Sequence, residues 1–168
     1  VSGHHVDTYK ELEQIQKEGR CRSIGISNYS EDDYMELEAA GLNVIPAVNQ
    51  MEVSPAMYRP ETIKFFTDKG IAVSASKALH RGASLEKAPI VDIARKHSVS
   101  PAQVMLRWGL QKRLAIATKT SSSDRMKENR KLLTFTLDKD DIALLDGITT
   151  EEDIFNRAEL EKTRKSSM

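Results

Sequence analysis

The sequence is organised around Ile116-Ala117-Thr118-Lys119-Thr120-Ser121-Ser122-Ser123-Asp124-Arg125-Met126-Lys127-Glu128-Asn129, a short apolar run followed by hydroxyl residues and a polar stretch typical of a helix start. The first N–H groups of a helix lack partners within the helix, and the helix dipole is positive there. A helix start therefore binds anions, and Lys119 and Arg125 would add two charge-assisted donors. These residues alone leave two interpretations open, an anion site and a solvent-exposed helix start.

The same pattern of an apolar run with a polar end occurs four times along the chain. We predict strands over residues 22–26, 44–48, 71–75 and 114–118, each followed by polar residues: Ser27-Asn28, Asn49-Gln50, Ser76-Lys77 and Lys119-Thr120. Repeated strand–helix units predict an α/β fold with a parallel sheet. In parallel barrels the chemistry lies at the carboxyl ends of the strands, and the loop after the last strand is a frequent phosphate site.

Predicted helices separate the predicted strands, and capping and breaking residues mark where these helices begin and end. The first helix begins near Asp7, directs Tyr9, Leu12 and Ile15 inward and ends at Gly19. The other helices begin at Ser30, Pro60, Pro89, the capping box Ser100-Pro101-Ala102-Gln103, and Asp138. Residues 76–87 are predicted to form a polar loop.

The amino-acid composition limits the classes of protein to which this chain can belong. The 168 residues suffice for one domain with a core, and 25 basic residues balance 25 acidic ones, so no nucleic-acid partner is predicted. Apolar runs are shorter than the ~18 residues of a membrane span, and no signal-peptide pattern is present, so we predict a cytoplasmic protein without a membrane partner. The lone Cys21 excludes an internal disulfide and is predicted to be a buried, unreactive thiol. No metal site is predicted.

Several segments resemble a known family. Residues 18–29, Glu-Gly-Arg-Cys-Arg-Ser-Ile-Gly-Ile-Ser-Asn-Tyr, closely resemble the central signature of the aldo-keto reductases. Residues 46–55 resemble the family's sixth-strand segment, and residues 100–108 are also typical of the family. Lys119-Thr120, followed by Arg125 and Asn129, resembles its third signature. The resemblance extends from about Tyr9 to Gly147.

The resemblance implies the C-terminal half, about four βα units, of a (β/α)8 barrel that uses NADPH to reduce aldehydes or ketones. Residues 1–168 would form a single partial domain, with residues 148–168 as a C-terminal loop and tail. The implied cofactor contacts are Ser27, Asn28 and Gln50 to the nicotinamide carboxamide, Lys119, Thr120 and Arg125 to the 2′-phosphate, Glu128 and Asn129 beside the ribose and adenine, and Leu79.

Two departures from the family pattern stand out. Ser76 occupies the position where the family usually has an aromatic residue stacked on the nicotinamide. In the following segment, Lys77, His80 and Arg81 would either bind the cofactor's pyrophosphate or form a solvated loop, and both interpretations stay open.

The second departure concerns catalysis. The family's catalytic Asp, Tyr, Lys and His lie in the first four βα units, which this sequence lacks, so no catalytic residue is assigned. His4 and His5 precede a helix and are predicted to be exposed. Three origins are open: part of a longer enzyme, a short product that self-associates or pairs with an N-terminal half through open barrel edges, or an unproductive remnant. The functional alternative to a reductase of small carbonyl substrates is a non-catalytic, NADPH-binding regulatory half-barrel.

Overall fold

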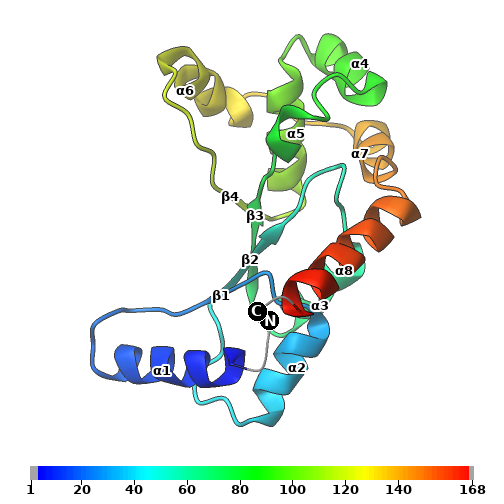
Figure 1. Cartoon of the computed structure of the whole chain (residues 1–168). Helices are drawn as coiled ribbons and strands as arrows, with labels where there is room; N and C mark the ends of the chain where they lie inside the picture. The colour runs from blue at the N-terminus through cyan, green and yellow to red at the C-terminus, as the bar shows by residue number, and fades with distance from the viewer. Residues whose placement is uncertain (1–3, 167–168) are drawn as a thin grey trace. The chain divides into compact units, whose positions relative to one another are not determined.

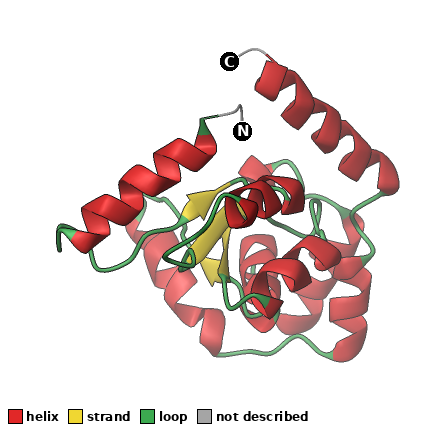
Figure 2. Ribbon diagram, turned by 90° about the horizontal axis from the view of Figure 1, so that it is seen from below, coloured by secondary structure: helices red, strands yellow, loops and turns green. Residues whose placement is uncertain are grey.

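The computed structural model describes residues 4–166, an α/β arrangement in which helices predominate and the strands are short (Figures 1 and 2). The chain divides into two compact units. The first consists of the described residues of Val1–Met51, Arg59–Val73 and Ile154–Met168, and the second of Glu52–Tyr58 and Ser74–Asp153.

The first unit contains two parallel strands and the helices that precede and follow them. Its elements are α1 (His5–Lys17), β1 (Ile26–Ser27), α2 (Glu31–Ala39), most of β2 (Val48–Glu52) and α3 (Pro60–Asp68). Ile26 of β1 lies opposite Asn49 of β2, and Ser27 lies opposite Gln50. The N–H of Ala72, at the start of β3 (Ala72–Ser76), donates to the carbonyl of Ala47 at 3.2 Å.

The second unit repeats the parallel arrangement. It contains the end of β3, α4 (Ala88–His97), α5 (Pro101–Gln111), β4 (Ala115–Ile116), α6 (Ser123–Arg130), α7 (Lys139–Asp146) and the 3₁₀ helices η1 (His80–Gly82) and η2 (Lys131–Leu133). Ser74 and Ala75 of β3 pair in parallel with Ala115 and Ile116 of β4. The predicted alternation of parallel strands and helices is confirmed.

The strands differ from their predicted bounds. The first two begin four residues later than predicted, at Ile26 and Val48. Pro46 has no N–H to donate, so backbone pairing in this segment begins only after it, where the N–H of Ala47 donates to the carbonyl of Ile24 at 2.9 Å. Gly25 lies so close to β2 that a Cβ atom there would be 2.7 Å from Cγ1 of Val48. The apolar runs mark where the strands lie, whereas the available donors set where pairing begins.

Helix starts follow the sequence closely. Ser30 and Ser100 each form a capping box with the residue three positions later, and Asp138 forms another with Asp141. Each cap residue accepts a hydrogen bond from an N–H that the helix itself leaves unpaired. The predicted starts of α2, α5 and α7 are therefore confirmed.

The predicted exposure of His5 is wrong. His5 is only 3 % exposed, and its Nε2 lies 3.2 Å from the carbonyl oxygen of Asp33. The buried face of α1 carries His5, Tyr9 and Glu13, which are spaced four residues apart, instead of the predicted Tyr9, Leu12 and Ile15. Polar side chains can occupy such a face when hydrogen bonds replace their lost water contacts.

Glu13 illustrates this replacement. Its carboxylate accepts hydrogen bonds from the backbone N–H groups of Asn43 and Val44 and from the side-chain amide of Asn43. Burial would raise the pKa of Glu13, but these bonds lower it overall. A buried carboxylate therefore joins α1 to the turn before β2, a role that a search for apolar spacing could not find.

Cys21 and the C-terminal segment also differ from expectation. Cys21 is partly exposed, not buried, because it lies in the connection before β1. The segment predicted as loop and tail contains α8 (Glu151–Ser166), which begins with reciprocal hydrogen bonds between Thr150 and Asp153. None of the helices in residues 4–166 has the length and apolar character that crossing a membrane requires.

An ion network joins α4 to α7. Nζ of Lys96 lies 2.6 Å from Oδ2 of Asp138 and 2.8 Å from Oδ1 of Asp141, and Nε2 of His97 lies 2.6 Å from Oδ2 of Asp141. The hydrogen bond from Lys96 is the largest cause that lowers the pKa of Asp138 to about 2. Burial would raise the pKa of Asp141, but hydrogen bonds from Lys96 and His97 outweigh it.

We expect the folded state to lose stability as the pH falls from the ordinary Asp138 pKa of 3.8 to about 2. A carboxyl group with a lowered folded-state pKa stabilises the fold above its unfolded pKa, and this stabilisation disappears as the folded form takes up the proton. Asp138→Asn keeps a good helix cap but removes the charge, so its urea midpoint should depend less on pH in this range. Equally steep midpoint curves for the variant and the parent protein would contradict this role of Asp138.

Candidate functional site

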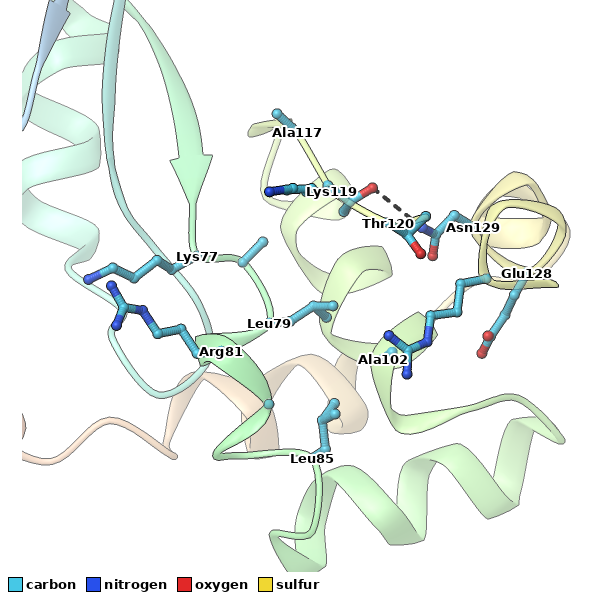
Figure 3. Close-up of a pocket in the computed structure, with 14 residues that line it drawn as sticks. Lys77, Leu79, Arg81, Leu85, Ala102, Ala117, Lys119, Thr120, Glu128 and Asn129 are labelled. Atoms are coloured by element: carbon cyan, nitrogen blue, oxygen red, sulfur yellow. Dashed lines mark hydrogen bonds between the residues drawn. The ribbon is translucent and has the colours of Figure 1, made fainter. Parts of the chain in front are cut away.

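The second unit contains a cavity of about 600 Å³ beside α6. Its walls come from the segment after β3, the start of α5, the segment after β4 and α6 itself (Figure 3). The lining residues are Lys77, Ala78, Leu79, Arg81, Gly82, Leu85, Ala102, Ala117, Thr118, Lys119, Thr120, Arg125, Glu128 and Asn129.

Positive charge predominates among the lining residues. Four of them are cationic, and Glu128 is the one acidic residue among the lining side chains that the structure describes. Of the cations, Lys77 pairs with the buried Glu52 at 2.5 Å. Within the described residues, the side chains of Arg81, Lys119 and Arg125 have no ion-pair partner. Cations that the protein leaves unpaired around a concave surface attract an anionic ligand.

Hydroxyl groups order the turn between β4 and α6. Oγ of Ser122 caps α6 by accepting a hydrogen bond from the N–H of Arg125, and the N–H of Ser122 donates to Oγ1 of Thr120 at 3.1 Å. The side-chain amide of Asn129 donates to Oγ1 of Thr118 at 3.4 Å, shown as a dashed line in Figure 3. The turn that carries Lys119 is thus attached to both ends of α6.

The segment after β3 has an unusual backbone. Lys77, His80 and Arg81 all adopt positive φ angles, of 52°, 47° and 54°. This left-handed backbone conformation costs free energy for residues other than glycine, and the residues that adopt it cluster at ligand sites. Besides its backbone hydrogen bonds, side-chain contacts hold the segment: the ion pair of Lys77 with Glu52, and the approach of Nδ1 of His80 to Oγ of the buried Ser84 at 2.6 Å.

The residues of this segment differ in their position relative to the cavity. Lys77 and Arg81 line the cavity, whereas His80 instead contacts Ser84 and is not among the lining residues. The position of the two cations supports the anion-binding interpretation for them. Ser76, at the position of the family's aromatic residue, is partly buried, and its carbonyl accepts a hydrogen bond from the N–H of Val53.

The remaining predicted residues form a second cluster, in the first unit. Oγ of Ser27 donates to the carbonyl of Gln50 at 3.0 Å, and the N–H of Asn28 donates to the same carbonyl at 2.9 Å. The side-chain amide of Asn28 donates to Oγ of Ser27, and Asn28 itself has a φ angle of 56°. The structure therefore brings Leu79, Lys119, Thr120, Arg125, Glu128 and Asn129 together around the cavity, and it brings Ser27 and Asn28, at the end of β1, together with Gln50 in the middle of β2.

Sequence reasoning missed some wall residues. Leu85 and Ala102 line the cavity, and Glu52 holds Lys77 beside it. Leu85 could have been noticed as one of the two leucines in the predicted polar loop, but nothing in the sequence links Glu52 to Lys77. Among the described residues, no group of three or more His, Cys, Asp and Glu side chains is placed to hold a metal ion.

Comparison with known proteins identifies the family. The sequence profile of the Aldo/keto reductase family matches residues 3–150. The chain belongs to the aldo/keto reductase family. This membership, together with the likeness to solved structures described below, confirms the predicted fold, a partial (β/α)8 barrel.

Individual relatives of this aldo/keto reductase chain agree with the assignment. An NAD(P)H-dependent D-xylose reductase of Scheffersomyces stipitis is 36% identical over 152 residues, which cover 82% of this chain and 48% of the reductase. An aldehyde reductase of Saccharomyces cerevisiae is 31% identical, with 86% of this chain and 46% of the relative covered. The chain spans about half the length of the curated relatives it matches.

A solved structure is similar in fold as well as in sequence. A mutant of Gox0644 in complex with NADPH superposes with a TM-score of 0.85 at 33% identity, covering 90% of this chain and 55% of that one.

Proposed function

We propose that this chain carries the cofactor-binding part of an NADPH-dependent reductase that converts aldehydes or ketones to alcohols by hydride transfer. The observation that carries the proposal is the cavity beside α6, where Arg81, Lys119 and Arg125 have no ion-pair partner within the described part of the chain. NADPH has anionic groups at its 2′-phosphate and its pyrophosphate, so its charge complements these cations. Relatives described as NAD(P)H-dependent and a related structure with bound NADPH support the choice of cofactor.

Within this proposal, different lining residues bind different groups of the cofactor. Lys119, Thr120 and Arg125 hold the 2′-phosphate, since a lysine and a guanidinium group provide charge-assisted donors. Glu128 and Asn129 lie beside the ribose and adenine, and Leu79 provides an apolar contact. The remaining cations of the wall, Lys77 and Arg81, would bind the pyrophosphate.

The cluster of the first unit suits a nicotinamide carboxamide. Ser27, Asn28 and Gln50 provide hydroxyl and amide groups, which can both donate and accept hydrogen bonds as a carboxamide requires. These contacts would orient the nicotinamide ring, from which the bound cofactor supplies the hydride. The left-handed backbone of Asn28 and its hydrogen bond to Ser27 fix both side chains in advance.

The proposal is tested by titrating the protein with NADPH and NADH and by following NADPH oxidation with a panel of small aldehydes and ketones. We expect NADPH to bind more tightly than NADH because of the 2′-phosphate contacts. Turnover of a carbonyl compound would support the reductase, whereas tight binding without turnover would favour a non-catalytic, regulatory role. Absence of NADPH binding would contradict the cofactor site.

A further inference from the structure

Helix α6 carries three of the proposed cofactor residues, Arg125, Glu128 and Asn129, yet buries none of its own side chains. Its large apolar residue, Met126, is 50 % exposed. Most helices of globular proteins are held in place by an apolar face that packs on the core. The position of α6 must therefore depend on other contacts.

The neighbouring helix α5 supplies these contacts through a polar face. Gln103, Arg107 and Gln111 are spaced four residues apart, so their side chains share one side of α5. We call these three residues the α5 polar stripe. The stripe extends from the start of α5 to its end, and each member hydrogen-bonds the segment that follows β4.

At one end of the stripe, Gln103 uses both atoms of its amide. It is 6 % exposed, its Oε1 accepts a hydrogen bond from the N–H of Ser100 at 3.0 Å, and its Nε2 donates to the carbonyl of Glu128 at 3.1 Å. Besides the bond from Gln103, this carbonyl accepts a hydrogen bond from the N–H of Lys131 at the end of α6, so Gln103 supplies its second donor, from outside the helix. The buried side-chain amide of Gln103 thus has a hydrogen-bond partner for both its oxygen and its nitrogen. Because an unpaired donor at this buried position would be costly, the contact between Gln103 and Glu128 is specific.

At the other end, Gln111 holds the backbone of Leu137. Its Oε1 accepts from the Leu137 N–H at 2.8 Å, and its Nε2 donates to the Leu137 carbonyl at 2.9 Å. Between the two glutamines, Nη2 of Arg107 donates to Oγ1 of Thr136 at 3.0 Å. The stripe therefore fixes both ends of residues 128–137, and Gln103 is the member that holds α6 itself.

We infer that Gln103 is a positioning residue, which sets the place of α6 and thereby the reach of Arg125 and Glu128 toward the 2′-phosphate and ribose of the cofactor. This inference rests on the proposed function. Gln103 itself does not line the cavity. It acts through the carbonyl of Glu128, so loss of its Nε2 donor moves the binding residues without altering any of them.

We call the hydrogen bond from Nε2 of Gln103 to the carbonyl of Glu128 the tether. Two matched variants distinguish the effect of the tether from that of the helix cap. Gln103→Met and Ser100→Ala each remove one of the two hydrogen bonds of the capping box, but only Gln103→Met also removes the bond to Glu128. Methionine is close to glutamine in size and neutral, so the charge around the cavity does not change. The ligands are adenosine 2′,5′-bisphosphate and adenosine 5′-monophosphate, titrated by calorimetry, and hydrogen exchange of residues 123–130 is measured without ligand.

For Gln103→Met we expect exchange in residues 123–130 to become faster by about threefold or more. Its affinity for the bisphosphate should fall about three- to tenfold, the loss that one hydrogen bond commonly produces, with a smaller fall for the monophosphate. A lower preference for the 2′-phosphate is the decisive readout, because general destabilisation would weaken both ligands equally. Ser100→Ala should keep the parent's preference and the parent's exchange in α6.

The outcomes separate this inference from the proposed function. Unchanged exchange in Gln103→Met, or the same change in Ser100→Ala, would overturn the tether. Faster exchange with an unchanged preference for the 2′-phosphate would overturn the positioning role. If the parent protein binds neither nucleotide, the cofactor proposal and the positioning role both fail, while the exchange of α6 still tests the tether.

Discussion

Replacing Lys119 with methionine is expected to weaken NADPH binding about ten- to hundredfold and to leave NADH binding within about twofold of the parent value. Each charge-assisted hydrogen bond lost costs on the order of 1.5–3 kcal/mol, and every 1.4 kcal/mol corresponds to about a factor of ten. Lys119 lines the cavity and has no ion-pair partner among the described residues, so its ammonium group is available to the 2′-phosphate. NADH has no phosphate at this position.

The chain offers a matched control for this variant. Lys127 lies on α6, is largely exposed and pairs with Asp124 at 3.5 Å, and it is not among the cavity-lining residues. Lys127→Met removes the same charge from the same region, so it should change the affinity for NADPH by less than about threefold. Equal losses for NADPH and NADH in Lys119→Met would remove the 2′-phosphate assignment.

Replacing Trp108 with alanine is expected to lower the free energy of unfolding by about 3–5 kcal/mol, the usual cost of deleting a buried aromatic side chain. Trp108 is 1 % exposed, and its ring packs edge-to-face on Tyr58 with the centroids 5.1 Å apart. Its indole N–H donates to Oδ1 of Asp146 at 2.8 Å. The residue therefore joins α5 to the end of α7 and to the loop after β2.

The measurement is urea denaturation followed by circular dichroism, with Trp108→Phe as the comparison. Phenylalanine keeps an aromatic ring but cannot donate to Asp146, so the expected loss is about 1–2 kcal/mol. Similar losses for the two variants would show that the hydrogen bond, not the ring volume, dominates. A loss below about 1 kcal/mol for Trp108→Ala would contradict the central role of this side chain in the second unit.

Local signals in the sequence predicted the fold well wherever the chemistry of one segment was decisive. Ser30 and Ser100 start helices because their hydroxyls cap N–H groups a few residues away, and no distant part of the chain is needed for that. Polar residues directly after short apolar runs were predicted at strand ends; Ser27 does end β1, whereas Gln50 lies inside β2, which continues to Glu52. The motif around Lys119 likewise identified half of the residues that surround the cavity.

The predictions that were wrong involve polar residues whose hydrogen-bond partners lie far away in the sequence. His5 and Glu13 look like solvent-facing residues in the sequence, but Asp33 and the turn at Asn43 supply hydrogen bonds that permit their burial. The connection between Lys77 and Glu52 also joins residues 25 positions apart, and spacing alone does not reveal it. In each case the chain pairs a polar group with a partner that only folding brings near.

The sequence by itself determined the alternation of strands and helices, the caps and the cationic motif after β4, because each depends on residues within one turn or one strand of each other. The tertiary structure alone decided which cations stay unpaired, which polar groups are buried and how α6 is held. Gln103 shows the difference most clearly: its capping bond to Ser100 can be predicted from residues three positions apart, whereas its bond to Glu128 exists only because folding brings Glu128 beside α5. Burial makes such a long-range bond decisive, since a buried amide without its partner cannot be compensated by water.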